Sequence, residues 1–491
     1  MRRLRCACLL VLLSFVSSTG AQTEPAGMAH RNVYRRLPVT TSSAEARKQF
    51  ETAMRNLEEL RSAEALENLR AATRADSHFA QAFILIAHLT RDPEEQSTAR
   101  AAAERLAPRV TRSERLFIRW LAGAQEGNYV PAIAAMNDLL SQYPQDQRLA
   151  FLVGAWFVNQ ERYLQAIVVL ERAVTLNPEY PAALNELAYA YAFSGNFEKA
   201  FNAMDRYVAL QPEQPNPHDS YGEILRLAGR FDAALQQYRV SIRVDPNFGS
   251  ELGVADTYAV MGREQDARDE YARAIVFVTS EHEKVAYELQ SAVTWIREDN
   301  RKEAEHALHD VARHAHKSGL ARLEAEANRV RGMYDSDYKS ALKNFQAAQQ
   351  ALEEHGLSRS DHDDELALVL QARASRAAAE RDTQTAANTV KQLEVMAENT
   401  RSQVVQLSWH AAAGAVLASQ EKYREAIAHL EEDSENPLSL RLLWEVYGKT
   451  GATGEAEAIA AKLGSLNVPT IEQALVVPLF RANLVSQARQ P

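Results

Sequence analysis

The stretch "AALNELAYAYAFSGNFEKAFNAMDRYVALQP", Ala182 to Pro212, decides the fold, and "GEILRLAGRFDAALQQYRVSIRVDP", Gly222 to Pro246, repeats its pattern. Three series of residues keep one period of 34 through this part of the chain. They are Pro144, Pro178, Pro212 and Pro246, then Ala166, Ala200 and Ala234, and finally Gly154, Ala188 and Gly222. Self-similarity at this period is typical of stacked helical hairpins and not of a single globular core.

Each series has a local physical reason. The alanines mark the close crossing of two antiparallel helices, where a larger side chain would push the helices apart. Gly195, Gly229 and Gly262 fall in the turn between helices, where glycine takes a positive φ at little cost. The prolines cannot continue the second helix. Followed outward, the alanine series continues as Ala65, Ala99 and Ala132 upstream, and as Ala267, Ala304, Ala341, Ala386, Ala426 and Ala456 downstream.

The two quoted segments resemble tetratricopeptide repeats (TPRs), because small, aromatic, glycine, alanine and proline positions all fall in phase. We place about twelve such repeats between Ala46 and Pro469. The resemblance implies an all-α fold, namely a right-handed superhelical solenoid of TPR-like helix-turn-helix repeats.

The pattern also divides the chain. The alanine spacing widens after Thr279, and the charged run "SRSDHDDE" within Gly356 to Glu365 is predicted to be a long loop or a break between two sub-arrays. The apolar C-terminal tail from Val468 is expected to cap the last repeat. The alternative is that this tail is a docking segment for a partner or a second copy. The predicted divisions are a signal peptide over 1–21, a linker over 22–43, an N-terminal TPR array over 44–279, divergent TPR-like repeats over 280–402, C-terminal TPR repeats over 403–467 and a cap or tail over 468–491.

The first residues have the pattern of a secretory signal peptide. A basic start with Arg2, Arg3 and Arg5 precedes a short apolar run from Leu9 to Val16, and small residues follow up to Ala21. The run is shorter than the roughly 18 residues that a membrane-spanning helix needs. We therefore expect cleavage after Ala21 and a periplasmic or secreted bacterial protein, with no membrane insertion after cleavage.

Cysteine content and charge limit the function further. Cys6 and Cys8 are the only cysteines, so the cleaved chain would have no disulfide, no reactive thiol and no cysteine-bound zinc. The formal charge is −10, and loss of the three leader arginines would leave about −13. An acidic chain without a clustered basic stripe is not expected to bind nucleic acid or an anionic membrane surface.

The sequence carries few signs of chemistry. It has no glycine-rich phosphate loop, no Gly-x-Ser-x-Gly elbow and no His-Glu-x-x-His helix, so we expect no catalysis and no cofactor. One local cluster, His306, His309, Asp310 and His314, could present metal ligands from one helical face. The apolar residues of that helix place this face outward, so an exposed polar surface is the favoured interpretation.

The resemblance also implies where a ligand would bind, because the first helices of TPR arrays line a concave groove that holds partner peptides. The inward positions are Phe117, Leu121, Arg148, Phe151, Ala155, Asn185, Tyr189, Phe193, Asn216, Asp219, Glu223, Arg226 and Asp256. The chaperone-tail binders of the family clamp a carboxylate with an asparagine where this chain has Ala155, Tyr189, Glu223 and Asp256, so that function is excluded. The hypothesis is a partner peptide with an apolar anchor and a basic flank; the alternative is that several aromatics are buried between repeats.

Three function classes follow. The leading one is a non-enzymatic scaffold for protein complexes of the bacterial envelope. The second is an accessory or regulatory subunit of an envelope enzyme or export complex, as in polysaccharide or cell-wall assembly. The third is an enzyme with an unrecognised domain between Lys317 and Arg401, where the repeats fade.

Overall fold

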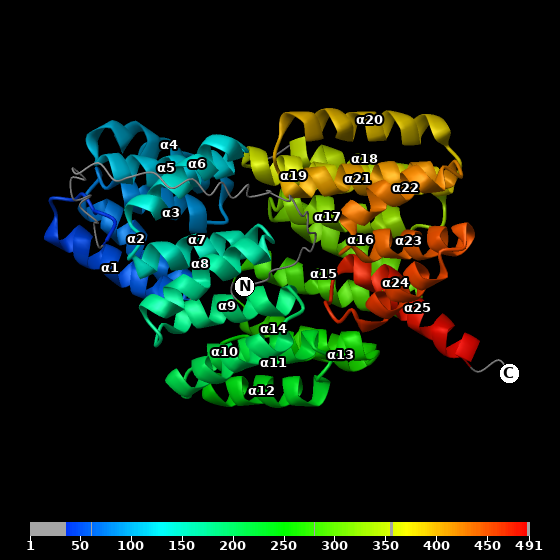
Figure 1. Cartoon of the computed structure of the whole chain (residues 1–491), viewed down its shortest axis with the longest axis horizontal. Coiled ribbons are helices and arrows are strands. Elements are labelled where there is room, and N and C mark those ends of the chain that lie inside the picture. The colour runs from blue at the N-terminus through cyan, green and yellow to red at the C-terminus, as the bar shows by residue number, and fades with distance from the viewer. Residues whose placement is uncertain (1–35, 60, 279, 354–356, 489–491) are drawn as a thin grey trace, which may run out of the picture.

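A computed structural model describes residues 36–59, 61–278, 280–353 and 357–488. The predicted signal peptide and most of the predicted linker lie outside the described residues. Within them the chain forms 25 α-helices and two short 3-10 helices, and no strand. Helices α1 to α24 pack as twelve consecutive pairs, and α25 follows alone (Figure 1). The predicted all-α repeat fold is confirmed.

The first half of the array contains seven pairs. They are α1 (Ala44–Glu58) with α2 (Ser62–Ala75), α3 (Ala80–Leu89) with α4 (Pro93–Leu106), α5 (Arg112–Gln125) with α6 (Tyr129–Gln142), α7 (Gln147–Asn159) with α8 (Tyr163–Leu176), α9 (Pro181–Phe193) with α10 (Phe197–Leu210), α11 (Pro215–Leu227) with α12 (Phe231–Val244) and α13 (Glu251–Met261) with α14 (Glu264–Phe277). The 3-10 helix η1 (Ala107–Arg109) follows α4.

The second half has longer helices, which explains the wider alanine spacing. They are α15 (Glu281–Arg297) with α16 (Arg301–Lys317), α17 (Ala321–Tyr334) with α18 (Tyr338–Glu353), α19 (Arg359–Ala379) with α20 (Thr383–Asn399), α21 (Gln403–Ser419) with α22 (Tyr423–Leu430), α23 (Pro437–Thr450) with α24 (Thr453–Ser465), and the last helix α25 (Ile471–Ala488). The 3-10 helix η2 (Glu431–Asp433) follows α22.

The helix crossings follow the repeat pattern. Ala166, Ala200 and Ala234 have no exposed surface. The glycine series packs against a large side chain of the second helix, since a Cβ added at Gly154 would lie 2.4 Å from Leu170. The turns are equally regular, and Gly195 ends α9 with a φ of +80°, as a left-handed C-cap requires.

The charged run before α19 was predicted wrongly. Residues from Arg359 onward are the first turns of α19 and not a loop. Ser358 is the N-cap, and its hydroxyl oxygen accepts a hydrogen bond from the Asp361 backbone N–H at 3.1 Å. Asp361 adds a carboxylate in the first turn, where the helix dipole favours negative charge. The charges thus start a helix.

The array folds back on itself. Helices α1–α9 form one block, α15–α25 form a second, and α10–α14 join them (Figure 1). The blocks also touch directly, because α5 contacts α19, and Arg91 before α4 lies 3.8 Å from the Glu283 carboxylate of α15. At the N-terminal side the extended residues 37–41 run along the starts of α5 and α7. There the Leu37 backbone N–H donates to the Asp146 carboxylate at 2.7 Å.

The C-terminal helix contacts two distant parts of the fold. Val476 and Phe480 pack against Leu440 and Leu463, so α25 covers the last helix pair. Earlier in the same helix, its residues pack against α15. Within the described residues, none of the helices combines the length and the apolarity that spanning a bilayer requires.

Candidate protein-binding surface

The predicted groove residues divide by burial. The fully buried ones, 2–8% exposed, are Phe117, Leu121, Phe151, Asn185, Tyr189, Arg226 and Asp256. The partly exposed ones are Arg148, Ala155, Phe193, Asn216, Asp219 and Glu223. A ligand can therefore contact the partly exposed residues directly, while the buried residues hold those side chains in place.

The aromatic part of the predicted groove is core. Phe117 packs edge-to-face against Trp120 with ring centroids 5.7 Å apart, and Phe151 packs against Tyr180 at 5.6 Å. Because these rings are enclosed by neighbouring helices, they hold the repeats together and do not line an open surface. This corrects the expectation of an aromatic stretch of groove at these two positions. Phe193 differs, since it is partly exposed and stacks on Tyr163 at 5.0 Å.

Arg148 is occupied by the first helix. Its guanidinium lies 2.7 Å from the Glu58 carboxylate and 3.0 Å from that of Glu51, both on α1. The Tyr180 hydroxyl donates a further hydrogen bond to Glu58 at 2.9 Å. These contacts close the inner face near α7, so Arg148 acts as a tie between α1 and α7.

The acidic part of the inner face forms one hydrogen-bonded network. On α11, the Arg226 guanidinium lies 3.2 Å from Glu223 and 3.1 Å from Asp256 of α13. The Tyr189 hydroxyl donates to the Glu223 carboxylate at 2.7 Å. Burial raises the pKa of the Tyr189 phenol, so the phenol stays protonated and acts as a donor. The structure therefore joins Tyr189, Glu223, Arg226 and Asp256 in one network.

A further residue of this network carried no sequence signal. Tyr271 of α14 donates its hydroxyl hydrogen bond to Asp256. It belongs to a second helix of a repeat, whose side chains were not expected to reach the inner face. Only the packing of α14 against α13 shows that it supports this carboxylate.

Asp219 is the least satisfied carboxylate here. Burial, followed by the nearby Glu223 charge, raises the pKa of Asp219 from 3.8 to about 6, against the opposing effects of Ser250 and Arg226. Asp219 and Glu223 lie one turn apart on α11, so two carboxylates share one face of the helix. A cation placed between them would relieve both burial and repulsion.

This shift makes stability depend on pH. Between about pH 4 and 6 the folded state holds a proton on Asp219 that the unfolded state has lost, so the free energy of unfolding falls as pH rises. We expect Asp219→Asn to raise the free energy of unfolding at pH 7 by about 1–2 kcal/mol, after allowance for solvent screening. The gain should vanish at pH 4. Urea unfolding of both proteins at the two pH values checks this, and a gain independent of pH would contradict it.

Asn185 adds a buried acceptor to the same surface. Its side chain is 2% exposed, and its Oδ1 atom has no hydrogen-bond partner among the described residues. A buried carbonyl oxygen of this kind is costly unless a donor reaches it.

The histidine cluster is not organised around a metal. His306 lies 3.6 Å from Asp310, whereas His314 turns to Glu288 of α15 at 2.7 Å and to Glu281 at 3.1 Å. Across the residues that the structure describes, no three His, Cys, Asp or Glu side chains are grouped closely enough to hold a metal ion.

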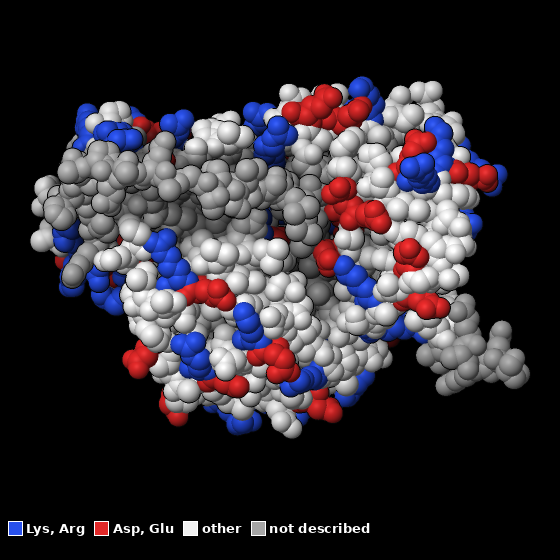
Figure 2. All heavy atoms as spheres, in the orientation of Figure 1, with Lys and Arg blue, Asp and Glu red and all other residues white. Residues whose placement is uncertain are grey.

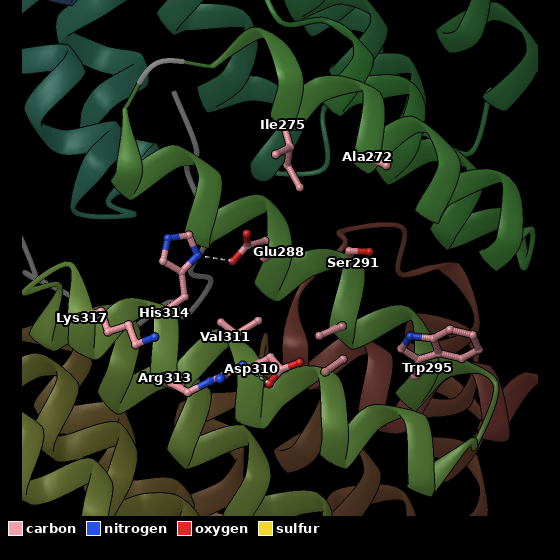
Figure 3. Close-up of a pocket in the computed structure, with 12 residues that line it drawn as sticks. Ala272, Ile275, Glu288, Ser291, Trp295, Asp310, Val311, Arg313, His314 and Lys317 are labelled. Carbon is pink, nitrogen blue, oxygen red and sulfur yellow. Dashed lines mark hydrogen bonds and ion pairs between the residues drawn. The ribbon is translucent and has the colours of Figure 1, made fainter.

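A shallow groove runs between α14, α15 and α16, with a volume of about 520 Å³ (Figure 3). Ile275 and Trp295 contribute its apolar lining, and the Glu288–His314 pair lies on its rim. The Arg268 guanidinium lies over the Trp295 ring, 3.6 Å from its centroid.

Residues 157–224 match the family model of the tetratricopeptide repeat. This segment of the chain consists of tetratricopeptide repeats. Proteins with this repeat are typically non-catalytic scaffolds that mediate protein–protein interaction. On the face shown in Figure 2, acidic and basic side chains are interspersed over both blocks of the TPR array.

Solved structures with a similar fold are distant in sequence. A MamA protein from Desulfovibrio magneticus RS-1 is 19% identical over 42% of this chain and 99% of its own, with a TM-score of 0.25. A tetratricopeptide repeat protein from Parabacteroides merdae is 12% identical over 62% and 98%, with a TM-score of 0.36. The APC/C hetero-tetramer Cut9–Hcn1 is 15% identical over 84% and 78%, with a TM-score of 0.42. No curated protein matches this TPR protein.

Proposed function

We propose that this protein is an exported, non-enzymatic scaffold of the bacterial envelope that binds a basic segment of a partner protein on the inner face of α9, α11 and α13. The observation that carries this proposal is the pair Asp219 and Glu223, two partly exposed carboxylates on one face of α11. Both lie on the inward helices of a repeat fold that typically binds proteins.

The charge of this surface favours a cationic ligand. Asp219 and Glu223 share one face of α11 with a single arginine, Arg226, so this face keeps an excess of negative charge. Asp256 pairs with Arg226 and also interacts with the buried Arg297. A lysine or arginine beside Asp219 would stabilise its ionised form. Phe193, partly exposed at the end of α9, offers an apolar contact beside the acidic pair.

The proposed location rests on the leader sequence, whose basic start, apolar run and small residues before Gln22 have the pattern of a secretory signal. Fractionation of the source bacterium tests it. Recovery of the chain from the cytoplasm at full length would contradict export.

The binding surface is tested by charge reversal. We expect Glu223→Lys to reduce capture of partner proteins from an envelope extract at least about tenfold, because it places a cation where a basic segment would bind. Asp138→Lys on α6 is the matched control, since it makes the same charge change at an exposed site and should leave capture unchanged. Quantitative mass spectrometry of the captured proteins gives the readout. Equal capture by all three proteins would contradict the proposed surface.

A further inference from the structure

The C-terminal segment, defined here as residues 466–484, lies against helices more than 200 positions earlier in the chain. The Asn467 amide donates to the Leu227 carbonyl oxygen at the end of α11, at 3.4 Å. Arg481 donates to the Val260 carbonyl oxygen in the last turn of α13 at 3.4 Å, and to Leu466 and Gly464. The segment therefore bridges the last helix pair and the middle of the array.

The first turn of α25 packs in an apolar cluster with residues of α15 and α17. Ile471 and Ala474 are 3% and 2% exposed, and they join a cluster with Leu289 of α15 and Val330 of α17. Beside them, the Glu472 carboxylate lies 3.1 Å from the Arg329 guanidinium of α17. An apolar pair with an adjacent carboxylate thus docks as an amphipathic helix docks in a groove.

The surface beneath this turn has its own polar pairing. Arg329 is 3% exposed and also pairs with Glu365 of α19 at 3.2 Å, so loss of Glu472 would not leave its charge alone. The Leu227 and Val260 carbonyls belong to the last turns of their helices, where water can replace a side-chain donor. Most of the free-energy cost of uncovering this surface therefore comes from exposing apolar side chains to water. Such a surface can exchange one amphipathic helix for another.

We propose that the inner face of α15 and α17 is a second protein-binding surface, that it accepts an amphipathic helix carrying a carboxylate for Arg329, and that the first turn of α25 occupies it until a partner helix displaces it. This inference rests on the proposed function of the array as a protein-binding scaffold. It concerns a different part of the inner face, with the opposite charge preference.

The tethered segment competes strongly with any partner. A short connection gives it an effective concentration on the order of millimolar, so a free helix of equal intrinsic affinity binds weakly to the intact chain. Weakening the segment's own contacts should therefore raise the apparent affinity for a free helix. Glu472 and Arg481 supply polar contacts in addition to that of Asn467, and both lie on the segment, so their replacement leaves the receiving surface unchanged.

The experiment uses the full chain and a fluorescent peptide of residues 466–484. We expect this peptide to bind the Glu472→Ala/Arg481→Ala chain at least tenfold more tightly than the unaltered chain, measured by fluorescence anisotropy. A peptide with Glu472→Lys should bind the same variant at least tenfold more weakly than the unaltered peptide, because it would face Arg329. Equal affinity for both chains, or equal affinity of both peptides, would overturn the proposal.

Hydrogen exchange on the unaltered chain gives an independent test that needs no variant. A displaceable segment should open more often than the pairs it covers, so amides of residues 474–480 should exchange at least tenfold faster than those of residues 440–447 in α23. Equal protection would show that α25 is a fixed part of the fold and would overturn the proposal. The Glu223→Lys experiment reports on α11 alone, so either proposal can fail without the other.

Discussion

Replacing Arg226 with methionine is expected to lower the free energy of unfolding of the central repeats by about 3–5 kcal/mol at pH 7. Arg226 is 3% exposed and neutralises Glu223 and Asp256, whose side chains are 26% and 12% exposed. Methionine fills much of the same volume but removes the guanidinium with which both carboxylates pair. The hydrogen bonds from Tyr189 and Tyr271 would remain, and they cannot replace the lost charge.

Urea unfolding monitored by circular dichroism measures this loss. Arg263→Met is the matched control, because Arg263 is paired with Asp266 at 2.7 Å but both side chains are 48% exposed. An ion pair in water contributes little, so the control should unfold close to the unaltered protein. Hydrogen exchange should place the Arg226→Met defect in α9 to α14, since each repeat contacts only its neighbours. A similar, small effect at both sites would contradict the network as described.

The period of 34 residues predicted the helix pairs because every contact it encodes is local. Ala200, Gly195 and the turn between α9 and α10 depend only on neighbouring residues, and the structure shows each as expected. The residues of the acidic network also come from neighbouring positions of the repeat pattern. Glu223 and Arg226 share one helix, and Asp256 follows in the next repeat.

Burial of the aromatics was not predictable from the period. Whether Phe151 faces a groove depends on the curvature of the array, and the curvature is set by contacts between distant repeats. The ion pair of Arg148 with Glu58 spans 90 residues, and it brings α1 over the inner end of α7. No repeat position encodes such a pair, because it occurs once.

The start of α19 shows a different kind of error. The charged run predicts a long loop or a break between sub-arrays, and the loop is wrong from Arg359 onward, because Ser358 followed by Asp361 is a helix-start signal that the sequence does contain. For the C-terminal tail, residues 468–491, the sequence contains no signal for the long-range contact that the structure shows. Its apolar residues indicated a cap or a docking segment, but only the fold shows that Asn467 reaches Leu227, 240 residues away.

Gly253→Ala in α13 is expected to lower the free energy of unfolding of the central repeats by about 1–3 kcal/mol through overpacking. A Cβ at this position would lie 2.1 Å from the Tyr238 ring, which is 1% exposed. The ring has no room to retreat, because its other side faces Gly222, where an added Cβ would stand 2.9 Å away. The ring of α12 is thus held between glycines of α11 and α13.

Two opposing effects decide the outcome of this substitution. Alanine is the better helix former by up to about 1 kcal/mol, and that gain alone would stabilise the helix. Gly448→Ala in α23 measures this gain in helix propensity without overpacking, since nothing lies within 4 Å of the added Cβ there. We therefore expect the two substitutions to shift the thermal midpoint in opposite directions, down for Gly253→Ala and up for Gly448→Ala. A stabilised Gly253→Ala protein would show that Tyr238 can move and that α11, α12 and α13 pack less tightly than the structure indicates.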